Sequence, residues 1–159
     1  MSTLDHAGGD LADLITPPGV VAQLRAPTKR HVLQELARRA GPMTGIDDKR
    51  VYDALAERER LGTTGIGAGV AVPHCRLPEL GRFFGMFARL ERPVPFEAID
   101  DQPVDLIFLL LAPADAGAEH LKALARVSRL LRDKAMCGKL RGADSADALY
   151  ALLTAGAAV

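Results

Sequence analysis

Aromatic residues are scarce in this chain: they make up 4% of its 159 residues, and tryptophan is absent. Proteins that bind single-stranded nucleic acid stack the bases on aromatic side chains, so this composition does not favour that function. Net charge is also lacking, because 20 lysines and arginines balance 20 aspartates and glutamates. No global field therefore draws the chain toward nucleic acid or an anionic membrane. We expect no nucleic-acid partner, and recognition must depend on local features.

Cysteines and long apolar runs are also few. The two cysteines, Cys75 and Cys137, form no Cys-x-x-Cys motif, so we expect free thiols in a reducing compartment. The longest strongly apolar run, residues 106–112, is far shorter than the roughly 20 residues of a membrane span. The first ten residues, MSTLDHAGGD, lack the cationic start and apolar stretch of a secretory signal. We therefore expect a cytoplasmic protein without membrane insertion.

The length and the apolar content point to one folded domain. Hydrophobic residues make up 48% of the 159 residues, which is enough to bury a sizeable core. Residues 1–10 are small and polar, and we predict that they form a flexible N-terminal tail. The predicted domain covers residues 11–159.

Apolar patterning predicts strands alternating with helices. The expected strands are 20–24, 70–72, 83–90 and 105–112, and the expected helices are 28–40, 47–61, 119–131, 134–140 and 145–153. Thr28 and Ser145 are expected N-caps, and Gly41-Pro42 is expected to end the first helix. The strand 105–112 is continuously apolar, so it should lie at the centre of a sheet covered on both faces. This order predicts an α/β fold: a single layered domain whose mixed β-sheet of about five strands is flanked by helices on both sides.

One helix carries a clear apolar stripe. In the predicted helix 119–131, one side is expected to contain Leu121, Leu124, Ala125, Ser128 and Leu131.

His74 is the first candidate for chemistry. It follows a glycine-rich segment and a proline in the stretch GTTGIGAGVAVPHC, residues 62–75. We expect Pro73 to end the strand 70–72, so that His74 lies at a strand end. A neutral imidazole with one nitrogen held by a hydrogen bond presents the other nitrogen as a nucleophile. Phosphoryl transfer suits such a group, because the protein mainly has to orient donors around three charged oxygens. His74 is therefore a candidate phosphoryl acceptor.

Candidate donors for a phosphoryl group lie near His74 in the sequence. Arg58, Thr63 and Thr64 precede it and carry guanidinium and hydroxyl donors, and the backbone of the glycine-rich segment carries N–H donors. His120 stands at the start of a predicted helix, where the helix dipole disfavours a cationic imidazole. A neutral His120 can donate to a phosphoryl group on His74. From the local pattern alone, His74 also fits a loop histidine and His120 a histidine near a helix cap.

Other chemistries have weaker patterns. The glycine-rich segment lacks the Lys-Ser/Thr ending of a Walker loop and precedes a strand, so it predicts no nucleotide or NAD site. A zinc site would need His74, Cys75, His120 and Cys137, whose spacing matches no zinc pattern. Cys75 as a nucleophile lacks an oxyanion or third-residue signature. We expect no metal and no cofactor, and a zinc or thiol hydrolase is the least favoured alternative.

Two stretches carry a family resemblance. The motif ERERLGTTGIGAGVAVPHC, residues 57–75, resembles the enzyme IIA proteins of the bacterial phosphotransferase system, of the fructose/mannitol type. The stretch FEAIDDQPVDLIFLLLAPADAGAEHLKAL, residues 96–124, looks more like the nitrogen-regulatory, PtsN-like branch than the sugar-specific one. By this resemblance, His74 matches the phosphorylated histidine, Arg58 the active-site arginine and His120 the second active-site histidine. Cys75 departs from the glycine that the family commonly has after the active histidine.

The resemblance also implies partners. The phosphoryl group would come from an HPr-like or NPr phosphocarrier protein and ultimately from phosphoenolpyruvate, with no metal or nucleotide at this step. Docking of that carrier calls for an apolar rim, for which the sequence offers Leu61, Ile66, Val70 and Leu77. Phosphorylation would then control regulated proteins such as kinases or potassium transport systems. Alternatively, a sugar-specific enzyme IIA would pass the phosphoryl group to a IIB domain.

Overall fold

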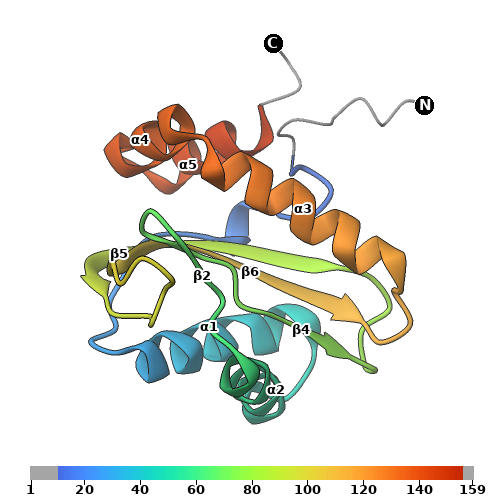
Figure 1. The fold of residues 1–159 in the computed structure, drawn as a ribbon. Helices are drawn as coiled ribbons and strands as arrows, with labels where there is room; N and C mark the ends of the chain where they lie inside the picture. Colours follow the sequence, from blue (N-terminus) through green and yellow to red (C-terminus); the bar gives the residue numbers. More distant parts are fainter. Residues whose placement is uncertain (1–10, 156–159) are drawn as a thin grey trace.

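A six-stranded mixed sheet organises the computed structural model, which describes residues 11–155 (Figure 1). The strands are β1 (Val20–Leu24), β2 (Gly65–Gly67), β3 (Val70–Ala71), β4 (His74–Leu77), β5 (Phe84–Val94) and β6 (Val104–Pro113). The α-helices of this part of the chain are α1 (Lys29–Thr44), α2 (Asp48–Leu61), α3 (Ala118–Arg132), α4 (Lys134–Gly142) and α5 (Ala146–Thr154). The predicted tail, residues 1–10, lies outside the described residues.

The sheet is mixed because its strands pair in both directions. Its main order is β1-β5-β6-β3-β2, and β4 pairs with β6 beyond this path. β5 is antiparallel to β6, whereas β3 and β4 are parallel to β6 and follow one another along the same edge of it. The most apolar strand of the sequence, β6, thus has neighbours on both sides, as predicted. The predicted α/β fold with a mixed sheet is confirmed.

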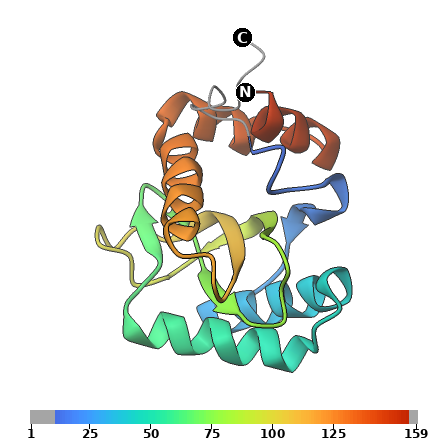
Figure 2. The ribbon, with the colours of Figure 1, turned by 90° about the vertical axis from the view of Figure 1, so that its right-hand side faces the viewer.

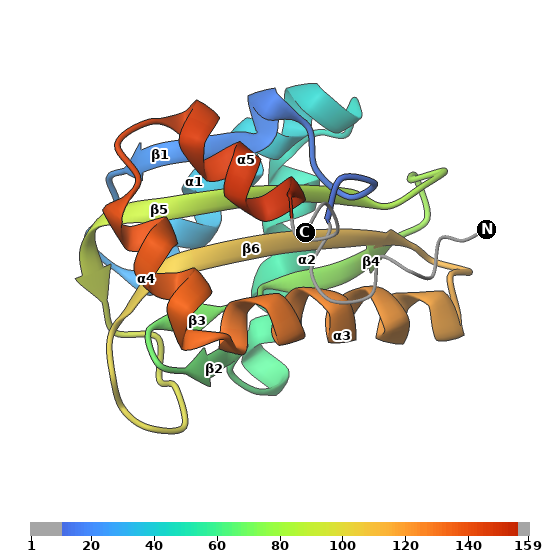
Figure 3. The ribbon, with the colours of Figure 1, turned by 90° about the horizontal axis from the view of Figure 1, so that it is seen from above.

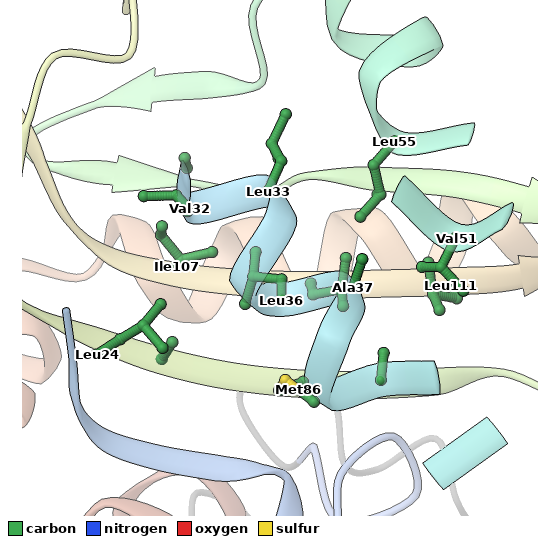
Figure 4. Close-up of a cluster of buried hydrophobic side chains, with 14 of the residues drawn as sticks. Leu24, Val32, Leu33, Leu36, Ala37, Val51, Leu55, Met86, Ile107 and Leu111 are labelled. Carbon is green, nitrogen blue, oxygen red and sulfur yellow. The ribbon is translucent and has the colours of Figure 1, made fainter. Parts of the chain in front are cut away.

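Both faces of the sheet are covered by helices, as the sequence predicted. Ile107, Leu109 and Leu111 of β6 pack in the cluster that contains α1 and α2, and the alternate residues of the strand pack in the cluster that contains α3, α4 and α5. Figure 3 shows α3, α4 and α5 lying over one face of the sheet. Figure 4 shows side chains of α1 and α2 meeting those of β5 and β6 on the other face. This alternation explains why β6 has no polar face.

The first helix is longer than predicted. We expected Gly41-Pro42 to end α1, but the helix continues to Thr44 with Pro42 inside its last turn. The helix ends at Gly45, whose left-handed φ of 77° lets its N–H donate to the Gly41 carbonyl at 2.8 Å. Because Pro42 has no N–H, this last turn lacks the hydrogen bond that another residue would make at position 42. The predicted caps Thr28 and Ser145 are confirmed, since their side chains accept from the N–H groups of residues 31 and 148.

The segment around His74 contains a strand that the sequence did not predict. The strand expected at 70–72 ends at Ala71, and a second strand, β4, begins at His74. Pro73 separates them but does not end the pairing with β6, because its carbonyl accepts from Leu110 N–H at 3.0 Å. His74 therefore begins a strand, whereas the sequence had suggested that it ends one.

The buried face of α3 differs from the predicted apolar side by about one residue. The buried residues are His120, Ala123, Val127, Leu130 and Leu131. Leu121 was expected on the apolar side but is 68% exposed. The pattern was misread because a histidine and two small or β-branched residues, instead of leucines, fill the first two turns of the buried face.

Candidate functional site

A cleft of about 650 Å³ lies between α2 and α3, with β4 at its base. Its lining comprises Arg50, Asp53, Ala54, Glu57, Arg58 and Leu61 of α2, His74, Cys75 and Arg76 of β4, and His120, Leu121 and Leu124 of α3. Figure 1 shows β4 and β6 ending on the same side of the molecule, where the connection to α3 begins. Figure 2 views this side and shows α2 and α3 on opposite sides of the sheet. The fold thus brings together three segments that are far apart in sequence.

His74 lies in this cleft with one nitrogen engaged. Its Nδ1 is 2.8 Å from the carbonyl oxygen of Val72. Because a carbonyl only accepts, Nδ1 carries the proton and Nε2 of the neutral ring is unprotonated. Burial lowers the pKa of His74; the Val72 bond opposes this effect and the Arg58 charge adds to it. The ring is therefore neutral at pH 7 and presents a nucleophilic Nε2.

His120 has the opposite proton arrangement. Arg76 Nε donates to His120 Nδ1 at 3.0 Å, so the neutral ring of His120 carries its proton on Nε2. That Nε2 is buried and has no hydrogen-bond partner among residues 11–155. The rings of His74 and His120 have centroids 5.6 Å apart and an interplanar angle of 76°. Burial lowers the pKa of His120, with further contributions from the charges of His74 and Arg76. The cleft thus pairs a free acceptor nitrogen with an unpartnered donor.

Arg58 supplies positive charge from the last turn of α2. Its Nη1 donates to the carbonyl of Gly62 at 2.8 Å, which anchors the guanidinium at the end of the helix. The guanidinium carries further N–H groups that suit a tetrahedral anion. Arg58 and His120 line the same cleft as His74, so the fold brings the three principal candidates together.

The two threonines lie elsewhere, and their donors are used. Thr63 Oγ1 donates to the Phe96 carbonyl at 2.7 Å, and the Thr64 hydroxyl and N–H both donate to the Glu59 carboxylate at 2.7 Å. Thr64 is 4% exposed, and neither threonine lines the cleft. This geometry corrects the prediction that Thr63 and Thr64 bind phosphate. Their nearness to His74 in sequence was misleading, because the chain turns away into a hairpin.

The glycine-rich segment forms that hairpin, β2–β3, and is not a phosphate cradle. Ala68 N–H donates to Asp100 Oδ2 at 2.9 Å, and Gly65 N–H donates to Thr63 Oγ1 at 3.0 Å. Gly69 has a φ of 81° and lies against Arg141 and Asp105. The glycines thus serve the tight turn and the close packing of the hairpin.

The predicted docking rim is corrected at two positions. Val70 and Leu77 are both 0% exposed, so they belong to the core and cannot contact a partner. Ile66 is half-buried, packs against the core cluster of α3 to α5 and lies outside the cleft lining. Leu61 is 77% exposed and lines the cleft. Leu121 of α3, which was not predicted as part of the rim, is 68% exposed and also lines the cleft.

Cys75 lies next to His74 but faces the core. It is buried, and burial raises the pKa of its thiol to about 12. A thiol with that pKa is not a thiolate at neutral pH, which argues against a nucleophilic role. Within residues 11–155, no group of three or more His, Cys, Asp or Glu side chains has the arrangement of a metal site. Across the same part of the chain, no helix has the length and apolarity needed to cross a bilayer.

Comparisons with known proteins identify the family of this chain. Residues 13–156 match the family described as "Phosphoenolpyruvate-dependent sugar phosphotransferase system, EIIA 2". A nitrogen regulatory protein of Bradyrhizobium diazoefficiens is 52% identical over 143 residues, which cover 90% of this chain and 94% of the relative. A nitrogen regulatory protein of Escherichia coli is 40% identical over 134 residues, covering 84% of this chain and 82% of the relative.

A solved structure shares the fold and part of the sequence. The crystal structure of the nitrogen regulatory protein IIA-Ntr from Neisseria meningitidis superimposes with a TM-score of 0.86 at 32% sequence identity. The match covers 91% of this chain and 99% of that one. The chain therefore belongs to the EIIA 2 family of the phosphoenolpyruvate-dependent sugar phosphotransferase system, in its nitrogen regulatory branch.

Proposed function

We propose that His74 accepts a phosphoryl group from a histidine-phosphorylated carrier protein of the HPr or NPr kind. The observation that carries this proposal is the bond of 2.8 Å between His74 Nδ1 and the Val72 carbonyl, which leaves Nε2 free. In the transfer, the P–N bond of the carrier breaks and a P–Nε2 bond forms on His74. A positive charge develops on the imidazole ring during the transfer. The Val72 carbonyl stabilises this charge by accepting the hydrogen bond from Nδ1–H.

The other polar groups of the cleft fit the oxygens of a phosphoryl group. Arg58 contributes a fixed positive charge, and the unpartnered Nε2–H of His120 contributes a donor in a buried position. In phosphoryl transfer, negative charge is spread over the phosphoryl oxygens. Donors that already point at these oxygens stabilise that charge without reorganising. We assign Arg58 and His120 to catalysis with His74.

The carrier docks on the apolar borders of the cleft. Leu61 on α2 and Leu121 on α3 are among the few large apolar side chains exposed in residues 11–155, and both line the cleft. An apolar centre with charged neighbours is typical of protein interfaces, and a contact of this kind suits a modest, transient complex.

We further propose that the phosphorylation state regulates partner proteins, such as kinases or potassium transport systems. A phosphoryl group adds nearly two negative charges at one surface site, which is sufficient to switch docking. The similarity to nitrogen regulatory proteins supports this role. The alternative is a sugar-specific enzyme IIA that passes the phosphoryl group to a IIB domain. The buried Cys75 disfavours the thiol hydrolase that the sequence had left open.

The proposal is tested by incubating the protein with phosphoenolpyruvate, enzyme I and the cognate carrier, followed by intact mass measurement. We expect one acid-labile phosphoryl group per chain. His74→Ala should carry none, and His31→Ala, which changes a histidine of α1 outside the cleft, should be labelled like the wild type. Equal labelling of His74→Ala and the wild type would refute the assignment.

A further inference from the structure

We propose that Arg76 is a positioning residue that holds His120 in the tautomer with its proton on Nε2. The proposal deepens the function given above and rests on it: Arg76 would keep a donor available for the phosphoryl group on His74.

The position of Arg76 is set by the strand that also carries His74. In β4, His74 and Arg76 are two residues apart and line the cleft with side chains that are not buried, whereas the side chain of Cys75 between them packs in the core cluster of α1 and α2 even though it also borders the cleft. This alternation follows from the period of two in a strand. From this position, Arg76 Nε reaches His120 Nδ1 on α3 at 3.0 Å. One short strand therefore places the phosphoryl acceptor and the group that contacts the second histidine.

The chemistry of arginine selects one tautomer of His120. A guanidinium has only donors, so it cannot accept a hydrogen bond from Nδ1–H. Its contact with Nδ1 is therefore favourable only when Nδ1 is unprotonated. In the neutral ring, the proton must then lie on Nε2.

The state of that Nε2 gives an independent reason to assign it a ligand. It is a buried donor without a partner in the described part of the chain, and such a group costs free energy unless something accepts from it. His74, whose ring centroid is 5.6 Å away, is where a phosphoryl group would be attached. With the opposite tautomer, His120 would present a lone pair to the phosphoryl oxygens and repel them.

Arg76 variants separate the tautomer from a simple loss of charge. Lysine keeps a donor-only cation, whereas glutamine carries both a donor and an acceptor and can satisfy either tautomer. Arg50→Gln is the matched control, because Arg50 lines the same cleft and pairs with Glu79. It removes the same charge without changing the contact to His120.

The test is long-range ¹H–¹⁵N NMR of the imidazole nitrogens in the full, unphosphorylated chain at neutral pH. We expect His120 in the wild type, Arg76→Lys and Arg50→Gln to carry its proton on Nε2. In Arg76→Gln, the ratio of the Nε2–H to the Nδ1–H tautomer should fall on the order of tenfold, since one charge-assisted hydrogen bond is lost. An unchanged ratio in Arg76→Gln, or a wild-type His120 with its proton on Nδ1, would overturn the proposal.

A second measurement links the tautomer to transfer. The rate of His74 phosphorylation should fall roughly tenfold in Arg76→Gln and recover in Arg76→Lys. A shifted tautomer with an unchanged rate would contradict the positioning role. If the wild type is not phosphorylated at all, the proposed function fails, whereas the NMR result still decides whether Arg76 sets the tautomer.

Discussion

His74 and His120 share one cleft but hold their protons on different nitrogens. A backbone carbonyl fixes the proton of His74 on Nδ1, and a guanidinium fixes that of His120 on Nε2. Under the proposed function, the same side chain therefore serves as nucleophile in one place and donor in the other, according to the group that contacts Nδ1. This division of roles requires that both rings stay neutral.

The neutrality of His74 can be tested by removing a charge. Its pKa is lowered chiefly by burial and further by the charge of Arg58. In Arg58→Gln, we expect the pKa of His74 to rise, and the acid limb of its acceptor activity to move to higher pH, because only the neutral ring offers Nε2. The pKa is measured by NMR titration of the ring protons.

Arg60→Gln is the control for this titration. Arg60 lies two residues along α2, is exposed and pairs with Glu57, outside the set of groups that shift His74. Its replacement should leave the titration of His74 unchanged. A His74 pKa that does not rise in Arg58→Gln would show that Arg58 does not act on the ring.

At the residue scale, the sequence predicted the histidines and Arg58 but not Arg76. The structure places His74, Arg58 and His120 in one cleft, and the sequence singled them out because their chemistry and a family motif coincide. The contact of Arg76 with His120 spans 44 residues and depends on the register of β4 on β6, which no local pattern encodes. Thr64 was misread because its partner, Glu59, could not be identified from spacing alone.

At the scale of elements, the turn of the hairpin β2–β3 needs a glycine at position 69. Gly69 has a φ of 81°, and a Cβ there would lie 2.5 Å from Arg141 Nη2 and 3.0 Å from Asp105 Oδ1. Gly69→Ala should therefore lower the free energy of unfolding by about 1–3 kcal/mol, measured by urea denaturation.

Gly138→Ala is the matched control in a helix. Gly138 lies inside α4, and a Cβ there would meet no atom within 4 Å. This change should raise the free energy of unfolding by roughly 0.5–1 kcal/mol, because alanine favours the helix. If Gly69→Ala were as stable as Gly138→Ala, the hairpin would not need the left-handed turn.

The elements that the sequence predicted least well are those whose limits depend on tertiary contacts. α1 continues beyond Pro42, and the left-handed turn that ends it lies at Gly45 instead of at the predicted Gly41-Pro42. β4 was missed because Pro73 suggested a strand end, whereas the strand continues to pair with β6. By contrast, strong patterns such as the apolar run of β6 and the cap at Thr28 were read correctly.

At the scale of the whole molecule, the two layers of helices make the cleft. α2 covers one face of the sheet and α3 the other, and both reach the β4 edge. The alternation of helices and strands predicted this layering. The strand order could not be predicted, because β3 and β4 share the same edge of β6 and only their packing decides that arrangement.

The two helices also border the proposed docking face. Leu61→Lys and Leu121→Lys should each raise KM for the phosphorylated carrier by about tenfold and leave kcat nearly unchanged, because these side chains lie at the border of the cleft. Ile99→Lys is the control, since Ile99 is 86% exposed but does not line the cleft. Equal KM values in all three variants would place the carrier elsewhere.

The central claim concerns one nitrogen atom, and NMR of the phosphorylated chain tests it most directly. ³¹P–¹⁵N correlation on the enzymatically phosphorylated, ¹⁵N-labelled protein identifies the nitrogen bonded to phosphorus. Since Nδ1 of His74 is held by the Val72 carbonyl, we expect phosphorus on Nε2 and a proton still on Nδ1. Phosphorus on Nδ1 of His74, or on any other residue, would contradict the account.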